Sequence, residues 1–371
     1  MFDFLPDVLR TPLAFLAVLG LLIFIHELGH YAAARWRGVH VDAFSIGFGR
    51  ALASWRDSRG TEWRIAWIPL GGYVKLHGQA PIGDLPEAER IEERTGQTFH
   101  DKPVGDRAII VAAGPIANFV LAIVLFAALY ATHGVPRGLT TISVVTPGLP
   151  AEAAGVLAGD TILALDGRAI SRFEDIQRYI QPRAGQSVML RVARSGETLE
   201  LPVTPVGRAG TEAESAGVIG VQGGQAEMER LGLPAAVWAG VTQTVEVSRA
   251  TLVGVGEMIA GTRSARELGG PIRIAEISGQ AATLGIVPLV NLMALLSVSL
   301  ALLNLFPVPL LDGGHLMFYA AEAIRGRPLP PRALEFGFRA GFAMLICLFV
   351  FATWNDVAYG SIGRWVAGLV G

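Results

Sequence analysis

The composition of this chain is typical of a membrane protein. It has 371 residues, of which 51% are hydrophobic and only 17% are charged, which excludes an ordinary soluble domain. A formal net charge of -2 excludes the overall basic field on which nucleic-acid-binding proteins depend. The single cysteine, Cys347, excludes an internal disulfide framework and a cluster of cysteine metal ligands.

Four apolar runs are long enough to cross a bilayer as helices: 12–33, 108–131, 286–311 and 336–354. With their flanking residues, the predicted spans occupy 1–36, 107–133, 286–313 and 335–357. A cleaved signal peptide is the alternative for the first run, because the small residues at 31–35 offer a cleavage site. The residues before that run include Asp3 and Asp7, however, whereas signal peptides begin with basic residues. We therefore expect an α-helical polytopic membrane protein.

Basic residues predict the orientation of the spans. The segment between the first two spans carries Arg35, Arg37, Arg50, Arg56, Arg59, Arg64, Lys75, Lys102 and Arg107. The turn between the last two spans carries Arg325, Arg327 and Arg332. Both segments are therefore expected to be cytoplasmic, which puts the two termini and residues 132–285 on the opposite side.

The cytoplasmic segment 37–106 contains a predicted β-hairpin at about 60–78. Apolar and polar residues alternate around Trp63 and Trp67, and the chain is expected to turn at Gly71-Gly72 before it continues with Tyr73. The hairpin either rests on the surface or enters the protein at membrane depth, where its edge can pair with an extended peptide. The residues alone leave both alternatives open.

Residues 138–206 are predicted to form a compact domain beyond the membrane. Strands are expected at 141–145, 161–165, 187–193 and 197–203, with a turn at Asp166-Gly167 and a helix from about Phe173. Residues 207–285 are predicted to be a linker followed by an amphipathic stretch after Pro234. That stretch is expected to lie along the membrane interface, since its charges disfavour a fifth span.

The polar residues of the first span indicate a metal site. His26 and His30 are four residues apart, so a helix places both imidazoles on one face at the spacing that one zinc ion needs. Glu27 lies between them, where its carboxylate can act as a general base. Each ionisable group in a span costs on the order of 2.5–3.5 kcal/mol, so three together need a role. The alternative is that they only form hydrogen bonds with neighbouring helices.

Asp312 is the strongest candidate for the third protein ligand of a catalytic zinc site. It lies at the cytoplasmic end of the third span, the end that His30 reaches in the first, where a helix is broken by Pro307, Pro309, Gly313 and Gly314. Asp312 could instead be a helix cap or turn residue, and His315 is a weaker rival ligand. Asn304, about two helical turns earlier, can donate a hydrogen bond to a substrate carbonyl or to another helix.

Four motifs together resemble those of the bacterial site-2 proteases, zinc metalloproteases that cut peptide bonds inside the membrane. They are HELGH (26–30), PLGGYVKLHG (69–78), AAGPIANF (112–119) and NLFPVPLLDGG (304–314). The resemblance implies that His26, His30 and Asp312 bind zinc and that Glu27 is the general base. It also implies that the substrate is contacted by Asn304, Pro307, Pro309, Gly71, Gly72 and Tyr73. Finally, it implies that the hairpin is a re-entrant element at membrane depth, beside an extended substrate.

The domain at 138–206 resembles a PDZ domain of the bacterial protease type through residues 148–170. Its Gly155, Gly159-Asp160 and Asp166-Gly167 fit the turn positions of that family. The best-known site-2 proteases carry two such domains in tandem, whereas this sequence shows one.

By resemblance, we expect a multi-pass zinc metalloendopeptidase of the cell inner membrane, with its PDZ domain periplasmic or extracytoplasmic and its active site near the cytoplasmic face. Its expected partners are membrane lipid and single-pass transmembrane substrates, an anti-sigma factor or remnant signal peptides, which receive their second cut in regulated intramembrane proteolysis. No nucleic-acid partner is expected. Three alternative functions explain less of the sequence. A zinc transporter needs no glutamate beside His26, and a scaffold that presents a PDZ domain needs no Glu27. A membrane protease for prenylated proteins does not explain the domain at 138–206.

Overall fold

The computed structural model describes residues 7–78, 97–138, 140–170, 172–207, 216–223, 226–267 and 269–359. The chain divides into two compact units. One unit combines residues 1–129 with residues 233–371, and the other comprises residues 130–232. The first contains the four predicted membrane spans apart from the last residues of the second span, and the second unit contains the predicted PDZ domain.

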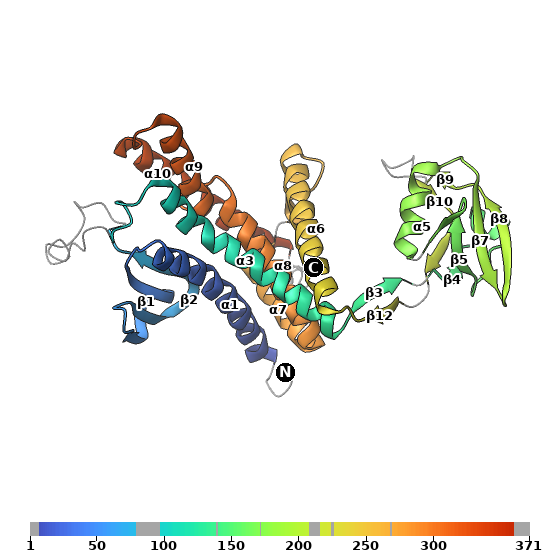
Figure 1. Cartoon of the computed structure of the whole chain (residues 1–371), viewed down its shortest axis with the longest axis horizontal. Helices are drawn as coiled ribbons and strands as arrows, with labels where there is room; N and C mark the ends of the chain where they lie inside the picture. Colours follow the sequence, from blue (N-terminus) through green and yellow to red (C-terminus); the bar gives the residue numbers. More distant parts are fainter. Residues whose placement is uncertain are drawn as a thin grey trace, which may run out of the picture. The chain divides into compact units, whose positions relative to one another are not determined.

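Helices make up most of the first unit, as Figure 1 shows: α1 (Asp7–Trp36), α3 (Val104–Thr132), α6 (Leu233–Ala260), α7 (Pro271–Leu284), α8 (Ile286–Leu305), α9 (Asp312–Arg325) and α10 (Pro331–Tyr359). Among the described residues, four helices are long and apolar enough to cross a membrane: α1, α3, α8 and α10. The 20 residues of α8 rise by about 30 Å, which matches the hydrocarbon core of a bilayer. These four helices agree with the four predicted spans.

The third span ends earlier than its hydropathy predicts. The predicted run continues to residue 311, but α8 ends at Leu305 and α9 begins at Asp312. Pro307 and Pro309 lack backbone N–H groups and so interrupt the helical hydrogen bonds, although the apolar side chains around them keep the hydropathy high. Leu310 has a φ of 85°, a left-handed conformation that is rare outside glycine. The break fixes where Asp312 begins the next helix.

Small residues let α1 pack closely against α7 and α8. The buried cluster between them contains Ala14, Val18, Leu22, Ala281, Ala282 and Leu289. Gly279 of α7 lies so close to Thr11 that a Cβ atom at position 279 would collide with the Thr11 side chain. Close contact of this kind stabilises helix pairs in membranes, where apolar burial between helices gives little.

The start of α7 is held by α10. Both carboxylate oxygens of Asp356 accept hydrogen bonds from the backbone. Oδ1 accepts the N–H of Gly270 at 2.8 Å, and Oδ2 accepts the N–H groups of Ile272 at 3.0 Å and Arg273 at 3.1 Å. The first turn of a helix leaves such N–H groups without partners in the helix itself. Asp356 therefore supplies the N-terminal cap of α7 from another helix.

A β-hairpin is present, but it is not the one predicted at 60–78, because most of that segment is the single strand β2 (Glu62–Leu76). Strands β1 (Val41–Arg56) and β2 pair, and the chain reverses at 57–61. There Asp57 Oδ1 accepts the backbone N–H groups of Arg59 at 2.9 Å and Thr61 at 3.0 Å. Gly71-Gly72, the predicted turn, lies inside β2. Glycine inside a strand can mark a close approach of other atoms, and that is its role here.

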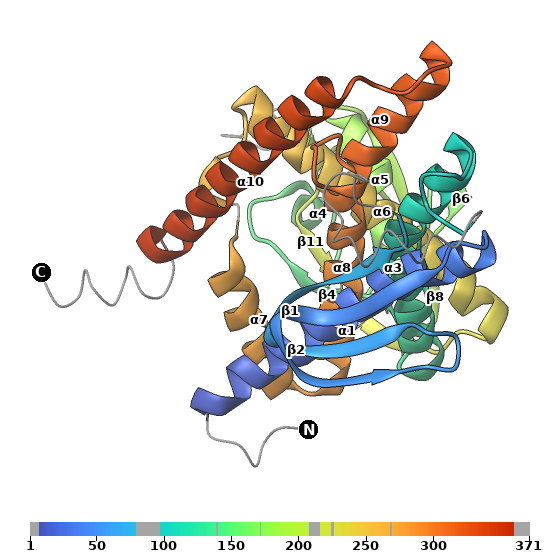
Figure 2. The ribbon, with the colours of Figure 1, turned by 90° about the vertical axis from the view of Figure 1, so that its left-hand side faces the viewer.

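Both strands bend, so the first half of β1 has neighbours on two sides. Residues 43–46 pair with 62–65 and also with 72–75. Figure 2 shows these strands beside α1. Among the described residues, no further strand pairs with 72–76, so this part of β2 forms an edge of the sheet.

The second unit is built mainly from short strands. Its elements are β3 (Val135–Gly138), β4 (Ile142–Val145), α4 (Pro150–Ala153), β5 (Thr161–Leu165), β6 (Arg168–Ala169), α5 (Phe173–Ile180), β7 (Val188–Arg194), β8 (Glu197–Val203), β9 (Val206–Gly207), β10 (Gly217–Val218), β11 (Val221–Gly223) and β12 (Ala226–Glu229). A four-stranded sheet has the order β6-β5-β7-β8. Its apolar side chains meet α5 in one core, which includes Ile162, Leu165, Ile176 and Leu190.

Strands continue into the segment predicted to be a linker. Within 207–232, β11 pairs with β4 through Val221 and Val145, and β12 pairs with β3 through Glu229 and Val135. Each partner lies far earlier in the chain, so local composition carries no sign of the pairing. The compact unit therefore extends over 130–232, beyond the 138–206 expected from the sequence.

Candidate metal centre

Two imidazoles of α1 face the same point. His26 and His30 are separated by one helical turn, and their Nε2 atoms are 3.2 Å apart. The ring centroids are 4.8 Å apart and the planes are almost perpendicular, at 83°. Both side chains are largely buried. The helix thus presents two nitrogen donors at one place within an apolar span.

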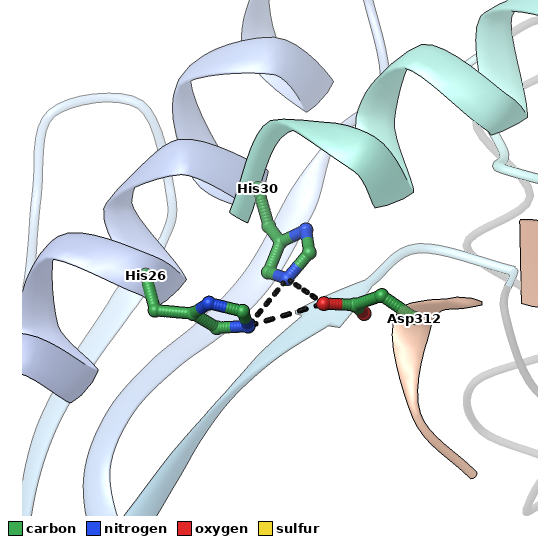
Figure 3. A group of neighbouring side chains, drawn as sticks. All are labelled: His26, His30 and Asp312. Atoms are coloured by element: carbon green, nitrogen blue, oxygen red, sulfur yellow. Dashed lines mark hydrogen bonds and ion pairs between the residues drawn. The ribbon is translucent and has the colours of Figure 1, made fainter. Parts of the chain in front are cut away.

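Asp312 brings a carboxylate to the same point from the start of α9. Its Oδ2 lies 3.2 Å from His26 Nε2 and 3.5 Å from His30 Nε2, and Figure 3 shows the three side chains turned towards one another. Oδ2 is buried and has no hydrogen-bond partner of acceptable geometry among the described residues. A buried carboxylate oxygen without a hydrogen bond is costly unless a cation occupies the space before it.

The break between α8 and α9 makes this approach possible. Gly313 packs against the carbonyl oxygens of Leu305 and Phe306, and Gly314 packs against that of Val308, so closely that a Cβ atom at either glycine would collide with backbone. Only glycine fits at both positions. The two glycines therefore let the start of α9 fold back against the end of α8, with Asp312 directed at the histidines.

Residues of helix α3 contact the Nδ1 atoms of both imidazoles, on the side away from the ligand cluster. His30 Nδ1 is 2.9 Å from the carbonyl oxygen of Ile110, and His26 Nδ1 is 3.2 Å from the side-chain nitrogen of Asn118. Gly114 lies against the His30 ring, where any side chain would collide with it. Hydrogen bonds on the far nitrogen fix the orientation of a ligating histidine. No role was predicted for Asn118, although an amide in an apolar span is a signal that could have indicated one.

Glu27 lies between the histidines and the edge of β2. A Cβ atom at Gly72 would be 3.1 Å from Glu27 Cγ and 2.9 Å from Ile23 Cγ2, so only glycine lets the strand approach α1 this closely. The Glu27 carboxylate accepts a hydrogen bond from the backbone of Val74. The carboxylate proposed as a base is thus next to the strand edge.

The other predicted site residues lie around this centre without joining it. Asn304 is in the last turn of α8, Pro307 and Pro309 are in the break, and Tyr73 follows the two glycines in β2. Among the described residues, no hydrogen bond or ion pair connects Asn304 to the three ligands. His315, the rival ligand, contacts the rings of Tyr319 and Phe338 and is not one of the three clustered donors.

The three donors fit a zinc ion. Their ligand atoms all lie within 4.8 Å of one another, and two imidazoles with one carboxylate form a known ligand set for catalytic zinc. Three protein ligands leave a fourth position for water or substrate. The arrangement can therefore support hydrolysis, and the Glu27 carboxylate interacts electrostatically with all three donors.

The chain matches the family model described as peptidase family M50 over residues 14–348. A protein of Rhizobium meliloti whose name describes it as a zinc metalloprotease is 45% identical over 356 residues, which cover 92% of this chain and 95% of that protein. Protease RseP of Yersinia pestis is 31% identical over 451 aligned positions, which cover 94% of this chain and 99% of that protein. Among solved structures, the PDZ domain of an SdrC-like protein from Listeria monocytogenes matches at 23% identity with a TM-score of 0.20, covering 24% of this chain and 90% of that domain.

Proposed function

This chain belongs to peptidase family M50 and is a zinc metalloprotease, and from that premise we propose that it cuts single-pass membrane proteins inside the bilayer. One observation carries the proposal. His26 and His30 lie in the apolar helix α1, and Asp312 meets them from the start of α9, just beyond the candidate span α8. Three metal ligands at such a place serve a reaction on a substrate that is itself in the membrane.

In the proposed reaction, His26, His30 and Asp312 hold zinc, and Glu27 transfers protons. Bound zinc would supply an activated water and polarise the carbonyl of the peptide bond. Glu27 accepts a proton from the attacking water and delivers it to the leaving nitrogen. Asn304 donates a hydrogen bond to the carbonyl oxygen as negative charge develops there.

The substrate must be extended where it is cut, because a helix engages its own carbonyl groups in hydrogen bonds. We propose that the edge of β2 at 72–76, next to Glu27, pairs with the unwound substrate. The outer surface of the hairpin supports a position at membrane depth. It exposes large apolar side chains, with Trp67 71%, Leu52 61% and Trp55 52% exposed. Water disfavours such a surface, whereas lipid accepts it.

A pair of glycine variants tests the role of this edge. In Gly72→Ala, the added methyl group would lie 2.8 Å from the Ser45 carbonyl oxygen, 2.9 Å from Ile23 Cγ2 and 3.1 Å from Glu27 Cγ, so this part of β2 must shift. We expect cleavage to fall on the order of 10–100-fold with zinc content unchanged, because a displacement of about 1 Å is enough for such a loss. Gly20→Ala, also in the first unit but with open space around it, is the matched control. Equal cleavage by both variants would remove the edge from the mechanism.

We further propose the cell inner membrane as the location, with the unit 130–232 in the periplasm as a PDZ domain that admits substrates already trimmed outside. Anti-sigma factors and remnant signal peptides are the proposed substrates, and the cut is the second step of regulated intramembrane proteolysis. Replacing residues 140–223 with a short flexible linker leaves β3 and β12 in place. This variant is expected to cut untrimmed substrate, and a retained need for trimming would contradict the gating role.

The main test compares Glu27→Gln with Glu246→Gln, an exposed glutamate on α6. Each variant is placed in liposomes with a tagged single-pass substrate, and cleavage and bound zinc are both measured. Loss of a general acid–base is expected to lower the cleavage rate by about 100-fold or more without loss of zinc. Glu246→Gln should match the wild type. Cleavage by Glu27→Gln at the wild-type rate would refute the mechanism, and zinc flux through the wild type without any cleavage would indicate a transporter.

A further inference from the structure

Asn118 is a buried amide in the middle of the apolar helix α3. It is 0% exposed, and its Nδ2 lies 3.2 Å from His26 Nδ1. Its Oδ1 is buried without a hydrogen-bond partner among the described residues. An amide placed in lipid-facing sequence costs free energy, and one whose oxygen is unpaired costs more. The His26 contact is the feature that can explain why the amide is there.

Helix packing does not account for this side chain. Ser297 of α8 donates a hydrogen bond to the main-chain carbonyl of Asn118 at 2.7 Å. That contact joins α3 to α8 and would exist with any residue at position 118, because it uses the backbone. The amide side chain points instead to α1 and His26.

The two imidazoles differ in how α3 holds them. His30 Nδ1 meets a carbonyl oxygen, which can only accept a hydrogen bond, so Nδ1 carries the proton and Nε2 is free to bind a metal. His26 needs the same arrangement, since its Nε2 also faces the cluster. The group in front of His26 Nδ1 must then be an acceptor. A half-turn of the Asn118 amide about its last side-chain bond exchanges nitrogen and oxygen, which are almost equal in shape.

We propose that Asn118 is a positioning residue for the metal centre, whose Oδ1 accepts the Nδ1–H of His26 and so directs His26 Nε2 at the metal. This inference rests on the proposed zinc site. It predicts that position 118 requires a hydrogen-bond acceptor, not merely a side chain of this size. Partners of this kind typically change metal affinity by about 10–100-fold when they are removed.

Three substitutions separate the acceptor from the packing. Asn118→Leu keeps a similar volume and removes the acceptor, Asn118→Ala removes both, and Asn118→Asp keeps an acceptor and makes it stronger by adding charge. Ser297→Ala is the matched control, because it removes the other polar contact of the same residue. The full-length chain in detergent is stripped of metal and titrated with zinc against a competing chelator. Cobalt(II) absorption reports the ligand geometry, and thermal unfolding of the metal-free chain reports folding.

We expect Asn118→Leu to raise the Kd for zinc by about 10–100-fold. In Asn118→Asp and Ser297→Ala, the Kd for zinc should be close to that of the wild type or lower. Wild-type affinity in Asn118→Leu, or equal weakening in Asn118→Asp and Asn118→Leu, would overturn the proposal. If Asn118→Leu does not fold, Asn118→Ala and Asn118→Asp decide in the same way. His26→Ala separates the two levels of inference, because unchanged zinc affinity in that variant would refute the metal site itself.

Discussion

Asp160 and Asp312, one in each unit, have opposite surroundings. Asp160, in the unit 130–232, is 1% exposed and has both oxygens engaged. Arg194 donates to Oδ1 and to Oδ2 at 2.7 Å, and the Leu157 N–H donates to Oδ2 at 2.8 Å. Asp312, in the unit with the membrane spans, has a buried oxygen with no hydrogen bond among the described residues and two imidazole nitrogens in front of it.

The difference separates a structural carboxylate from a functional one. A carboxylate whose two oxygens both accept hydrogen bonds from the protein stabilises the local fold. An unpaired buried polar group costs about 1–3 kcal/mol, and more when it is charged, so a fold that retains one needs another reason for it. At Asp312 the proposed reason is a cation held jointly with His26 and His30. The same substitution, aspartate to asparagine, tests this difference at both positions, because its effects on zinc binding and on stability should be opposite.

Asp312→Asn should have the largest effect. A neutral amide is a poor zinc ligand, so we expect zinc affinity and cleavage both to fall. Removing a residue that only forms a hydrogen bond to a ligand typically costs about 10–100-fold in affinity, and the loss here should be larger. Thermal unfolding of the metal-free chain should change little, because the substitution removes a partly buried charge and also its ion pairs with His26 and His30. Metal analysis and calorimetry measure the two effects. Normal zinc binding in this variant would mean that Asp312 is not a ligand.

Asp160→Asn should show the reverse pattern. It removes the charge that pairs with Arg194, so the midpoint of thermal unfolding of the unit 130–232 should fall by about 5–10 °C. Zinc content should match the wild type, because no ligand is touched. Calorimetry of the full chain and metal analysis test both statements. A loss of zinc comparable to that of Asp312→Asn would contradict the separation of structural and functional aspartates.

Much of the metal centre could be predicted because its signals are local. The spacing of His26 and His30 and the proline and glycine residues around Asp312 are visible within a few positions. The family and the enzyme class, a zinc metalloprotease, are confirmed by the comparisons. The contact of Asn118 with His26 was not predicted because it depends on α3 packing against α1, and the sequence of a single span does not show which helix it packs against. The role of the individual ligands stays a prediction.

The fold was predictable where a pattern is continuous and failed where the chain pairs at a distance. The helices α1 and α3 follow from long apolar runs, and β5, β8 and the start of α5 fall where they were expected. The strands β11 and β12 were not predicted because they have only three and four residues and pair with strands far earlier in the chain. Gly71-Gly72 was interpreted as a turn, whereas Gly71 makes room for the Phe48 ring and Gly72 lets β2 contact α1 near Glu27.

The smallest expected effect is a pH dependence at Asp160 that sharpens the comparison. The hydrogen bonds from Arg194 hold the pKa of the Asp160 carboxyl below its usual range, against the opposing effect of burial. The unfolded chain has the ordinary value of about 3.9, so between the two values the unfolded state binds more protons. The stabilisation is therefore fully present above about pH 5, declines as the pH approaches the lowered pKa, and is lost below it. The difference in unfolding midpoint between wild type and Asp160→Asn should be constant from about pH 7 to pH 5 and should shrink below about pH 4. A difference that persists unchanged at about pH 2 would show that packing, not the ion pair, is what Asp160 contributes.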